Sequence, residues 1–158
     1  LFLSGSANLY DDVELVVQPV PDTKMGEANS MDMVLVFRMM HNVHSYKLWD
    51  AWMKAAHSAL KPGGVLAVVQ HRAADDANPD ESAPKGYMPE PWLIEKIESD
   101  GLKLKAKSDT NANPKDTKDY NAGVWELPPV LRADDANNDK MRAIGESDRM
   151  TLRFRKPS

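Results

Sequence analysis

The sequence contains no cysteine. This absence excludes disulfide bonds, thiolate metal sites and cysteine nucleophiles, but it leaves the compartment open, because cytoplasmic and exported proteins can both lack cysteine. Long apolar runs are also missing, since none approaches the roughly 20 residues that a membrane-spanning helix needs. Lysine and arginine are scattered rather than gathered into a stripe, and the formal net charge is −4. We therefore expect neither a membrane nor a nucleic acid as a partner.

The composition is typical of one soluble globular domain. The chain has 158 residues, of which 42% are apolar and 28% are charged, and we assign residues 1–158 to a single domain. It begins at Leu1 rather than at methionine, and its first ten residues lack the positive charge that opens a signal peptide. We expect the natural start to lie upstream.

Two apolar runs in the first quarter of the chain indicate buried strands. Residues 13–17 (VELVV) are mostly β-branched and are closed by Pro19, which cannot donate to a β-ladder. Residues 31–37 (MDMVLVF) are apolar almost without interruption. Such a run predicts a strand of a parallel sheet that helices cover on both faces.

A helix and another strand follow. In residues 46–60 the apolar side chains recur at helical spacing, and Ser45 can cap the first turn. Residues 61–64 (KPGG) end this helix, and residues 65–70 (VLAVVQ) predict the next strand, which completes a βαβ unit. The two glycines follow a helix and precede a strand, the reverse of a phosphate-binding loop, so we predict a tight turn rather than a phosphate nest.

The second half of the chain is less regular. Residues 73–91 predict a long loop, and residues 90–100 predict a helix. Residues 102–108 and 150–155 alternate between apolar and polar side chains, which predicts an antiparallel strand pair at a sheet edge. Residues 109–149, which separate them, are polar and give only a weak helical signal near their end.

Ligands of doubly wound sheets bind beyond the carboxyl ends of the parallel strands. This rule selects three loops, residues 18–20, residues 37–44 and residues 71–72. Arg38, in the second loop, can clamp a carboxylate or a phosphate of a substrate, or it can pair with a nearby acid.

The same loops contain His41, His44 and His71. Because imidazole titrates near physiological pH, His41 or His71 can act as a general base toward a hydroxyl or amine, although either can instead only hydrogen-bond its loop. A metal site would combine His41 and His44, three residues apart, with His71. The H-E-x-x-H pattern of stronger metal sites is absent, and we predict no metal.

Two stretches resemble class I S-adenosylmethionine-dependent methyltransferases. SMDMVLVFRMMHNV (residues 30–43) resembles the fourth strand of that family with its leading aspartate, Asp32. ALKPGGVLAVVQHR (residues 59–72) resembles the turn into the fifth strand, and its LKPGGVL segment is fairly specific. His41, SDTNANPKD and SDRMTLRFRKP resemble, more narrowly, a bacterial subfamily of predicted methyltransferases. The resemblance covers about residues 13–157.

The resemblance implies a Rossmann-like, doubly wound α/β fold with a mostly parallel sheet and a C-terminal antiparallel strand pair. It also implies S-adenosylmethionine as cofactor and a small-molecule acceptor that it does not identify. By the match to the family, Pro19 and Val20 flank the adenine of the cofactor, and Phe37 and Arg38 contact the cofactor at the methyl-transfer centre.

The resemblance further implies that His41, His71 and Arg38 are catalytic and that His44 and Arg72 bind the substrate. The glycine-rich loop after the family's first strand and the acidic residue after its second have no counterpart before residue 13. Each missing strand–helix unit takes on the order of 30 residues. The fold is therefore expected to be incomplete, and we expect this chain alone to bind the cofactor weakly or not at all.

Two alternatives to an enzyme of this family remain open. The chain can be a non-catalytic half-domain that self-associates, because an exposed strand flank beside residues 13–17 or residues 31–37 invites pairing with a second copy. On this basis we expect a homo-oligomer. It can also be a different doubly wound domain that binds a small molecule.

Overall fold

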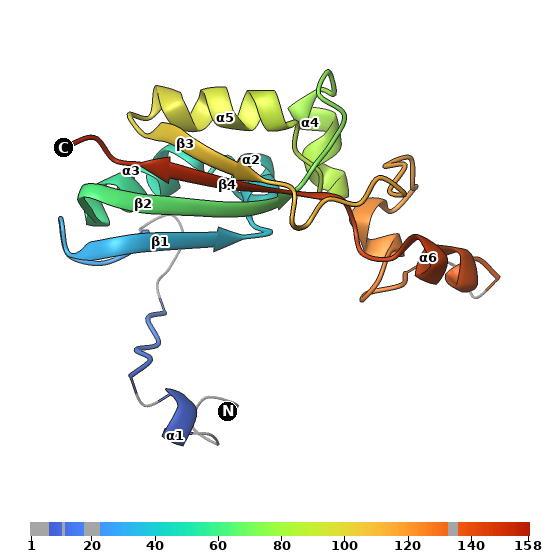
Figure 1. Ribbon diagram of the computed structural model, residues 1–158, viewed down its shortest axis with the longest axis horizontal. Helices are drawn as coiled ribbons and strands as arrows, with labels where there is room; N and C mark the ends of the chain where they lie inside the picture. Colours follow the sequence, from blue (N-terminus) through green and yellow to red (C-terminus); the bar gives the residue numbers. More distant parts are fainter. Residues whose placement is uncertain (1–6, 11, 18–22, 133–135) are drawn as a thin grey trace.

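The computed structural model describes residues 7–10, 12–17, 23–132 and 136–158 (Figure 1). No helix within these residues is both long enough and apolar enough to cross a membrane. The strands are β1 (Met31–Phe37), β2 (Leu60–His71), β3 (Lys103–Ser108) and β4 (Arg149–Arg155). The α-helices are α1 (Ala7–Tyr10), α2 (Met40–Ser45), α3 (Trp49–Ala59), α4 (Pro79–Ser82), α5 (Glu90–Ser99) and α6 (Asn138–Ile144), and the 3-10 helices are η2 (Ala83–Lys85) and η3 (Gly123–Glu126).

The strands form one four-stranded sheet in the order β1-β2-β4-β3. β1 and β2 run parallel, with Val34 opposite Leu66 and Phe37 opposite Val69. β4 is antiparallel to both of its neighbours, β2 and β3. The predicted α/β architecture with a C-terminal antiparallel strand pair is therefore confirmed. The last strand of the chain lies inside the sheet, and β3 forms the edge.

One face of the sheet carries the main core. Its inward side chains, among them Val36, Leu66, Val68 and Phe154, are buried and pack against the apolar sides of α2, α3 and α5. Figure 1 shows α5 running alongside the sheet, next to β3. Because burying one such side chain contributes about 1.5–3 kcal/mol, this face is the main source of stability.

The opposite face of β1 is uncovered, which differs from the prediction of helices on both faces. Met33, Leu35 and Phe37 point to this side and are 51%, 56% and 55% exposed. The outer edge of β1 also has no strand partner among the described residues. The continuous apolar run therefore reflects one buried face and one apolar face that is open to solvent.

Two local predictions were wrong. Residues 13–17 lie extended and exposed without joining a strand, because a β-ladder forms only where a neighbouring backbone supplies its hydrogen bonds. Ser45 does not cap the following helix, because it belongs to α2. α3 begins after Leu48 and has no side-chain cap.

The glycine pair forms the predicted turn between helix and regular strand. Gly63 has a φ of +76°, a left-handed conformation that favours glycine. A Cβ atom on Gly64 would lie 2.8 Å from the carbonyl oxygen of Lys61, so this position has no room for a side chain. β2 already begins at Leu60, and both glycines exchange backbone hydrogen bonds with Lys156. The pair thus shapes the first, irregular part of β2.

The described part of residues 109–149 forms a small lobe beside the end of the sheet, which includes η3 and α6 (Figure 1). This lobe packs on the chain after β2 through a second apolar cluster that is separate from the main core. The cluster consists of Ala73, Tyr87, Tyr120, Val124, Leu127 and Met141. The segment without a clear sequence pattern is thus ordered by burial against the rest of the fold.

Candidate functional site

A cavity of about 310 Å³ lies where β1 and β2 end, between the sheet and the lobe of residues 109–149. We call it the histidine cleft, because His41 and His71 line it. It is also lined by Phe37, Arg38, Asn42, Val124, Trp125, Pro128, Pro129, Val130, Ser147 and Arg149. Its position matches the sequence-based expectation that a ligand site lies beyond the carboxyl ends of the parallel strands.

The two histidines come from different elements and meet in the histidine cleft. His41 belongs to the first turn of α2, and His71 is the last residue of β2. Both side chains are buried, and their ring centroids lie 6.0 Å apart. The indole of Trp125 stands edge-on to His41, with the ring centroids 6.0 Å apart. The histidines thus share one small, largely enclosed space.

Gln70 contacts His41 and fixes its position at the histidine cleft. Its carboxamide oxygen accepts a hydrogen bond from the N–H of Met40 at 3.1 Å, and its amide nitrogen donates to the carbonyl oxygen of Gly86 at 2.8 Å. These two backbone partners set the orientation of the amide. Nδ1 of His41 lies 3.2 Å from the amide nitrogen and 3.4 Å from the oxygen. Gln70 can therefore serve His41 both when Nδ1 accepts and when Nδ1 donates.

Burial and nearby positive charge keep both imidazoles neutral at pH 7. Burial lowers the pKa of His41 below its usual range, and the hydrogen bond with Gln70 offsets this only in part. The pKa of His71 is lowered to about 3, first by burial and then by His41, Arg149 and Arg38. Nδ1 of His71 also lies 2.5 Å from the hydroxyl oxygen of Ser147. A neutral imidazole is the form that accepts a proton.

Arg38 lies at the rim of the histidine cleft, directly after β1. Its backbone N–H donates to the carbonyl oxygen of Val69 at 2.7 Å, which extends the pairing of β1 with β2 by one step. Its φ of +54° is in the left-handed region, which is uncommon for a residue with a side chain. The other arginine of the cleft, Arg149, forms an ion pair with Glu146.

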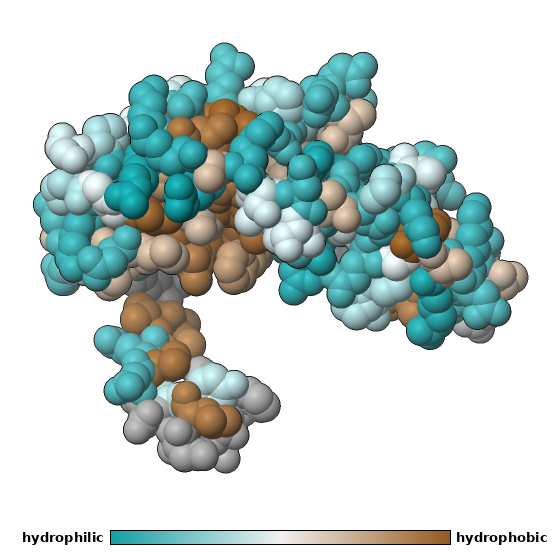
Figure 2. Space-filling model, in the orientation of Figure 1, coloured by the Kyte–Doolittle hydropathy of each residue, from teal (hydrophilic) through white to brown (hydrophobic). Residues whose placement is uncertain are grey.

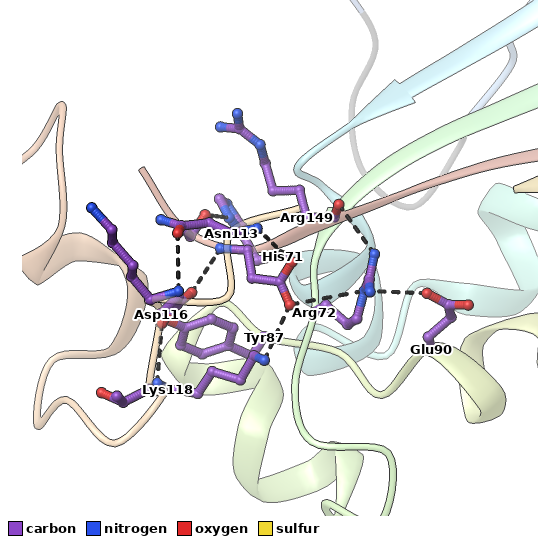
Figure 3. Close-up of polar contacts among 12 residues, drawn as sticks. His71, Arg72, Tyr87, Glu90, Asn113, Asp116, Lys118 and Arg149 are labelled. Carbon is purple, nitrogen blue, oxygen red and sulfur yellow. Dashed lines mark hydrogen bonds and ion pairs between the residues drawn. The ribbon is translucent and has the colours of Figure 1, made fainter. Parts of the chain in front are cut away.

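Arg72 points away from the histidine cleft, although the sequence places it next to His71. Its guanidinium lies 3.2 Å from a carboxylate oxygen of Glu90 and 3.4 Å from one of Asp109 (Figure 3). Adjacent residues of a strand point to opposite faces, so His71 and Arg72 cannot both face one cavity. The geometry gives Arg72 a place in an ion-pair network instead.

His44 also lies outside the histidine cleft. Its Nε2 is 2.8 Å from a carboxylate oxygen of Asp80, and its ring stands edge-on to Trp92 with the centroids 4.9 Å apart. It lines a different cavity of about 470 Å³. The combination of His41, His44 and His71 as metal ligands is therefore not assembled. The described part of the chain contains no group of three or more His, Asp or Glu side chains that could hold a metal.

A buried polar network holds the lobe of residues 109–149 against β2 (Figure 3). The hydroxyl of Tyr87 donates to both carboxylate oxygens of Asp116, at 3.0 and 3.1 Å, and Asp116 also accepts from the N–H of Asp148 at 2.8 Å. The ammonium of Lys118 lies 3.1 Å from the Asp148 carboxylate. Burial and the charge of Asp116 raise the pKa of Tyr87, so this phenol stays a donor. Because Asp148 lies between Ser147 and Arg149, the network positions both at the histidine cleft.

Several cleft residues were missed by the sequence analysis, namely Gln70, Trp125, Ser147 and Arg149. Gln70 had a usable signal, because it is a polar residue at an inward position of an otherwise apolar strand. Ser147 and Arg149 stand at the start of an antiparallel strand, so they lie at the sheet edge where β2 ends. Trp125 gave no signal, since only the packing of the lobe brings it to His41. Pro19 and Val20, predicted to flank the adenine, lie outside the described residues.

Comparisons with known proteins connect this geometry with one fold. No protein-family model matches the sequence, and no curated protein matches it either. Among solved structures, the cyclase SpnF superposes with a TM-score of 0.64 at 16% identity, over 99% of this chain and 60% of that one. The 1,6-didemethyltoxoflavin-N1-methyltransferase of Burkholderia thailandensis, solved with S-adenosylhomocysteine, gives 0.60 at 15% identity, over 98% and 56%.

A third solved structure, a putative sarcosine dimethylglycine methyltransferase of Galdieria sulphuraria, gives a TM-score of 0.58 at 16% identity, over 99% and 64% of the two chains. The present chain thus spans about 60% of the length of the structures that it matches. One of these structures is named a cyclase, so the shared fold does not by itself decide the reaction. The chain has the fold of the class I S-adenosylmethionine-dependent methyltransferases.

Proposed function

We propose that this chain contributes the acceptor side of an S-adenosylmethionine-dependent methyltransferase, with the histidine cleft as the place where the acceptor is deprotonated. The observation that carries the proposal is the pair of buried, neutral imidazoles 6.0 Å apart at the ends of two parallel strands. In doubly wound sheets this edge is where ligands bind. The fold that the chain shares with methyltransferases supports the same reaction class.

The described residues fit one side of the cofactor. Phe37 and Arg38 end β1 with exposed side chains, and they can contact the cofactor from this strand. S-adenosylmethionine, when bound, supplies the methyl group. The glycine-rich loop that the family uses for the methionine part of the cofactor has no counterpart in the sequence. The proposal therefore concerns the acceptor side of the site.

The chain's own residues orient the acceptor and take its proton. An acceptor O–H or N–H donates to Nε2 of His71 when Nδ1–H of the same ring donates to Ser147 at 2.5 Å. A pKa of about 3 makes His71 a weak base at pH 7, so His71 mainly orients the acceptor. His41 takes the proton, because Gln70 supports its Nδ1 in either role. Positioning in an enclosed site contributes most to such transfers, and general-base assistance contributes roughly 10²–10⁴-fold.

The test is transfer of a labelled methyl group from S-adenosylmethionine by the full natural chain that contains residues 1–158. We expect His71→Asn to slow transfer by roughly 100-fold, because the asparagine amide can keep the hydrogen bond that Nδ1 makes with Ser147 but has no atom in place of Nε2 to hold the acceptor. His57→Gln, a change on α3 away from the histidine cleft, is the matched control and should leave the rate unchanged. A full chain that does not bind S-adenosylhomocysteine would refute the proposal.

A second candidate function is self-association through β1, and a specific observation favours it. The uncovered face of β1 exposes Met33, Leu35 and Phe37 beside a strand edge that lacks a partner within the described ranges. Such an edge is a template for pairing with a second copy. Light scattering after size-exclusion chromatography should find a dimer that Leu35→Lys converts to a monomer, while Tyr46→Lys, at another exposed site, does not. A monomeric wild-type chain would contradict this candidate.

A further inference from the structure

The histidine cleft carries positive charge without an acidic side chain in its lining. Its lining includes two arginines, Arg38 and Arg149, and two neutral histidines, but neither aspartate nor glutamate. The chain as a whole has a formal net charge of −4, so the charge of the cleft lining is opposite in sign to that of the whole chain. A cavity lined by one sign of charge concentrates ligands of the opposite sign.

Of the two arginines that line the histidine cleft, Arg38 is the one whose guanidinium is open to a ligand. Its side chain is exposed at the rim and makes no hydrogen bond or ion pair with another described residue. The left-handed backbone at this position is unfavourable for a residue with a side chain, and residues held in such conformations cluster at functional sites. The hydrogen bond from its N–H to Val69 holds the backbone in place. The fold therefore holds a residue in a left-handed conformation whose guanidinium has no ion-pair partner among the described residues.

Arg149 faces the same space from β4. Figure 3 shows its side chain extending away from the Tyr87–Asp116 network, while Arg72 turns toward Glu90. Arg149 pairs with Glu146 through one terminal nitrogen, and its buried Nε has no hydrogen-bond partner within the described part of the chain. The charges of Arg38 and Arg149 both act on His71 strongly enough to lower its pKa. Both arginines line the same cavity as His71.

Part of the remaining lining is apolar and carries flat rings. Trp125, Phe37 and the two prolines 128 and 129 supply rings on the walls of the histidine cleft. Its volume of about 310 Å³ is that of a site for a small molecule. The combination fits a ligand with a planar apolar body and one anionic group at the rim.

We propose that the acceptor of this site is a small anionic molecule whose carboxylate or phosphate is bound by Arg38, with Arg149 as a second cation. This inference rests on the proposed function and names the substrate class of the same site. Guanidinium groups bind both anions through two parallel hydrogen bonds, which would orient the acceptor's nucleophile toward His71.

The experiment measures binding of three probes to the chain of residues 1–158 by NMR, with the Arg38 side chain and the Trp125 indole N–H as reporters. Benzoate and phenyl phosphate carry the two anions on one ring, and benzamide is the neutral molecule of similar shape. We expect at least one anion to shift both reporters and to bind about 10-fold more tightly than benzamide, since a charged hydrogen bond is lost with the neutral probe. The probe that binds more tightly shows whether the anionic group of the acceptor is a carboxylate or a phosphate.

Two variants test whether Arg38 itself binds the anion or whether any positive charge on the protein has the same effect. Arg38→Gln should weaken anion binding about 10-fold, while Arg153→Gln, which removes an exposed charge from the middle of β4, should not. Equal binding of benzamide and the anions, or equal effects of the two variants, would overturn the inference. Unchanged amide spectra outside the histidine cleft show that each variant folds.

The outcomes for the two proposals can be told apart. If benzoate or phenyl phosphate binds at Arg38 but the full natural chain transfers no methyl group, the proposed function fails and the anion site stands. If methyl transfer occurs and Arg38→Gln transfers at the same rate and KM as Arg153→Gln, the anion site fails and the methyltransferase proposal stands.

Discussion

The Nδ1 atom of His71 and the hydroxyl oxygen of Ser147 lie 2.5 Å apart, so a side-chain hydrogen bond joins the end of β2 to the start of β4. The bond buries one nitrogen of the imidazole and leaves the other for a ligand. It also places a titratable group between two parts of the chain that must stay together for the histidine cleft to exist.

Acid should destabilise the protein through His71. Its ordinary pKa is 6.5 and its pKa in the folded chain is about 3, so between these values the unfolded chain binds a proton that the folded chain does not. The stability from the neutral ring is complete above pH 6.5 and is lost as the pH falls toward 3, by up to about 1.4 kcal/mol per pH unit. Urea unfolding at about pH 7 and pH 5 measures this loss. His71→Gln should lose less stability than the wild type over the same interval, and equal losses would contradict the assignment.

Gln70→Leu should destabilise the fold and release His41. The change leaves the N–H of Met40 and the carbonyl of Gly86 without their partner in a buried place, at a cost of about 1–3 kcal/mol for each group. Chemical denaturation measures the total. Gln70→Glu supplies a negative charge beside Nδ1 and should raise the pKa of His41, which an NMR titration of its ring protons can follow. A pKa of His41 that stays the same in Gln70→Glu would show that Gln70 does not act on this histidine.

Arg38→Gly should stabilise the fold while it removes anion binding. Glycine adopts a positive φ without steric cost, so the change relieves strain of roughly 1 kcal/mol at the end of β1. Thermal unfolding should show a higher Tm for Arg38→Gly than for Arg38→Ala, which keeps the strain and also lacks the charge. If Arg38→Gly is the less stable of the two variants, the left-handed backbone at this position does not carry the expected strain.

Tyr87→Phe should loosen the lobe of residues 109–149. It removes the hydroxyl that donates to both oxygens of buried Asp116, at a cost of about 1–3 kcal/mol. Hydrogen exchange should become faster in η3 and at Ser147, while the amides of β1 and β2 stay protected. Tyr46→Phe removes a hydroxyl from a side chain that is 70% exposed and should change neither property.

The regular part of the fold could be predicted because it depends on local patterns. The run of residues 31–37 and the alternation of residues 102–108 and 150–155 identified three of the strands to within one residue at each end. Residues 13–17 have the same composition as a strand but no ladder partner among the described residues. Composition alone does not say whether a neighbour is present.

The location of the candidate site could be predicted from the sequence, but several of the residues that line it could not. The rule for parallel strands located the cavity and brought in Arg38, His41 and His71. The sequence then misled twice. Arg72 follows His71 directly, and adjacent positions along a strand face opposite sides. His44 lies one helical turn after His41, but its ring contacts Asp80 and Trp92 at a different cavity. Trp125 and Ser147 reach the histidine cleft only through the contacts of Asp116 and Asp148, which join residues far apart in the chain.

The position of β4 between β2 and β3 governs when this protein can fold. Val65 pairs with Arg155, and His71 pairs with Arg149, so the central ladder of the sheet joins the middle of the chain to its last residues. During synthesis β2 and β3 stay unpaired with each other until β4 has left the ribosome and inserts between them. Contacts of such long sequence separation slow folding, so we expect nascent chains that stop before residue 149 to stay open to proteases and chaperones.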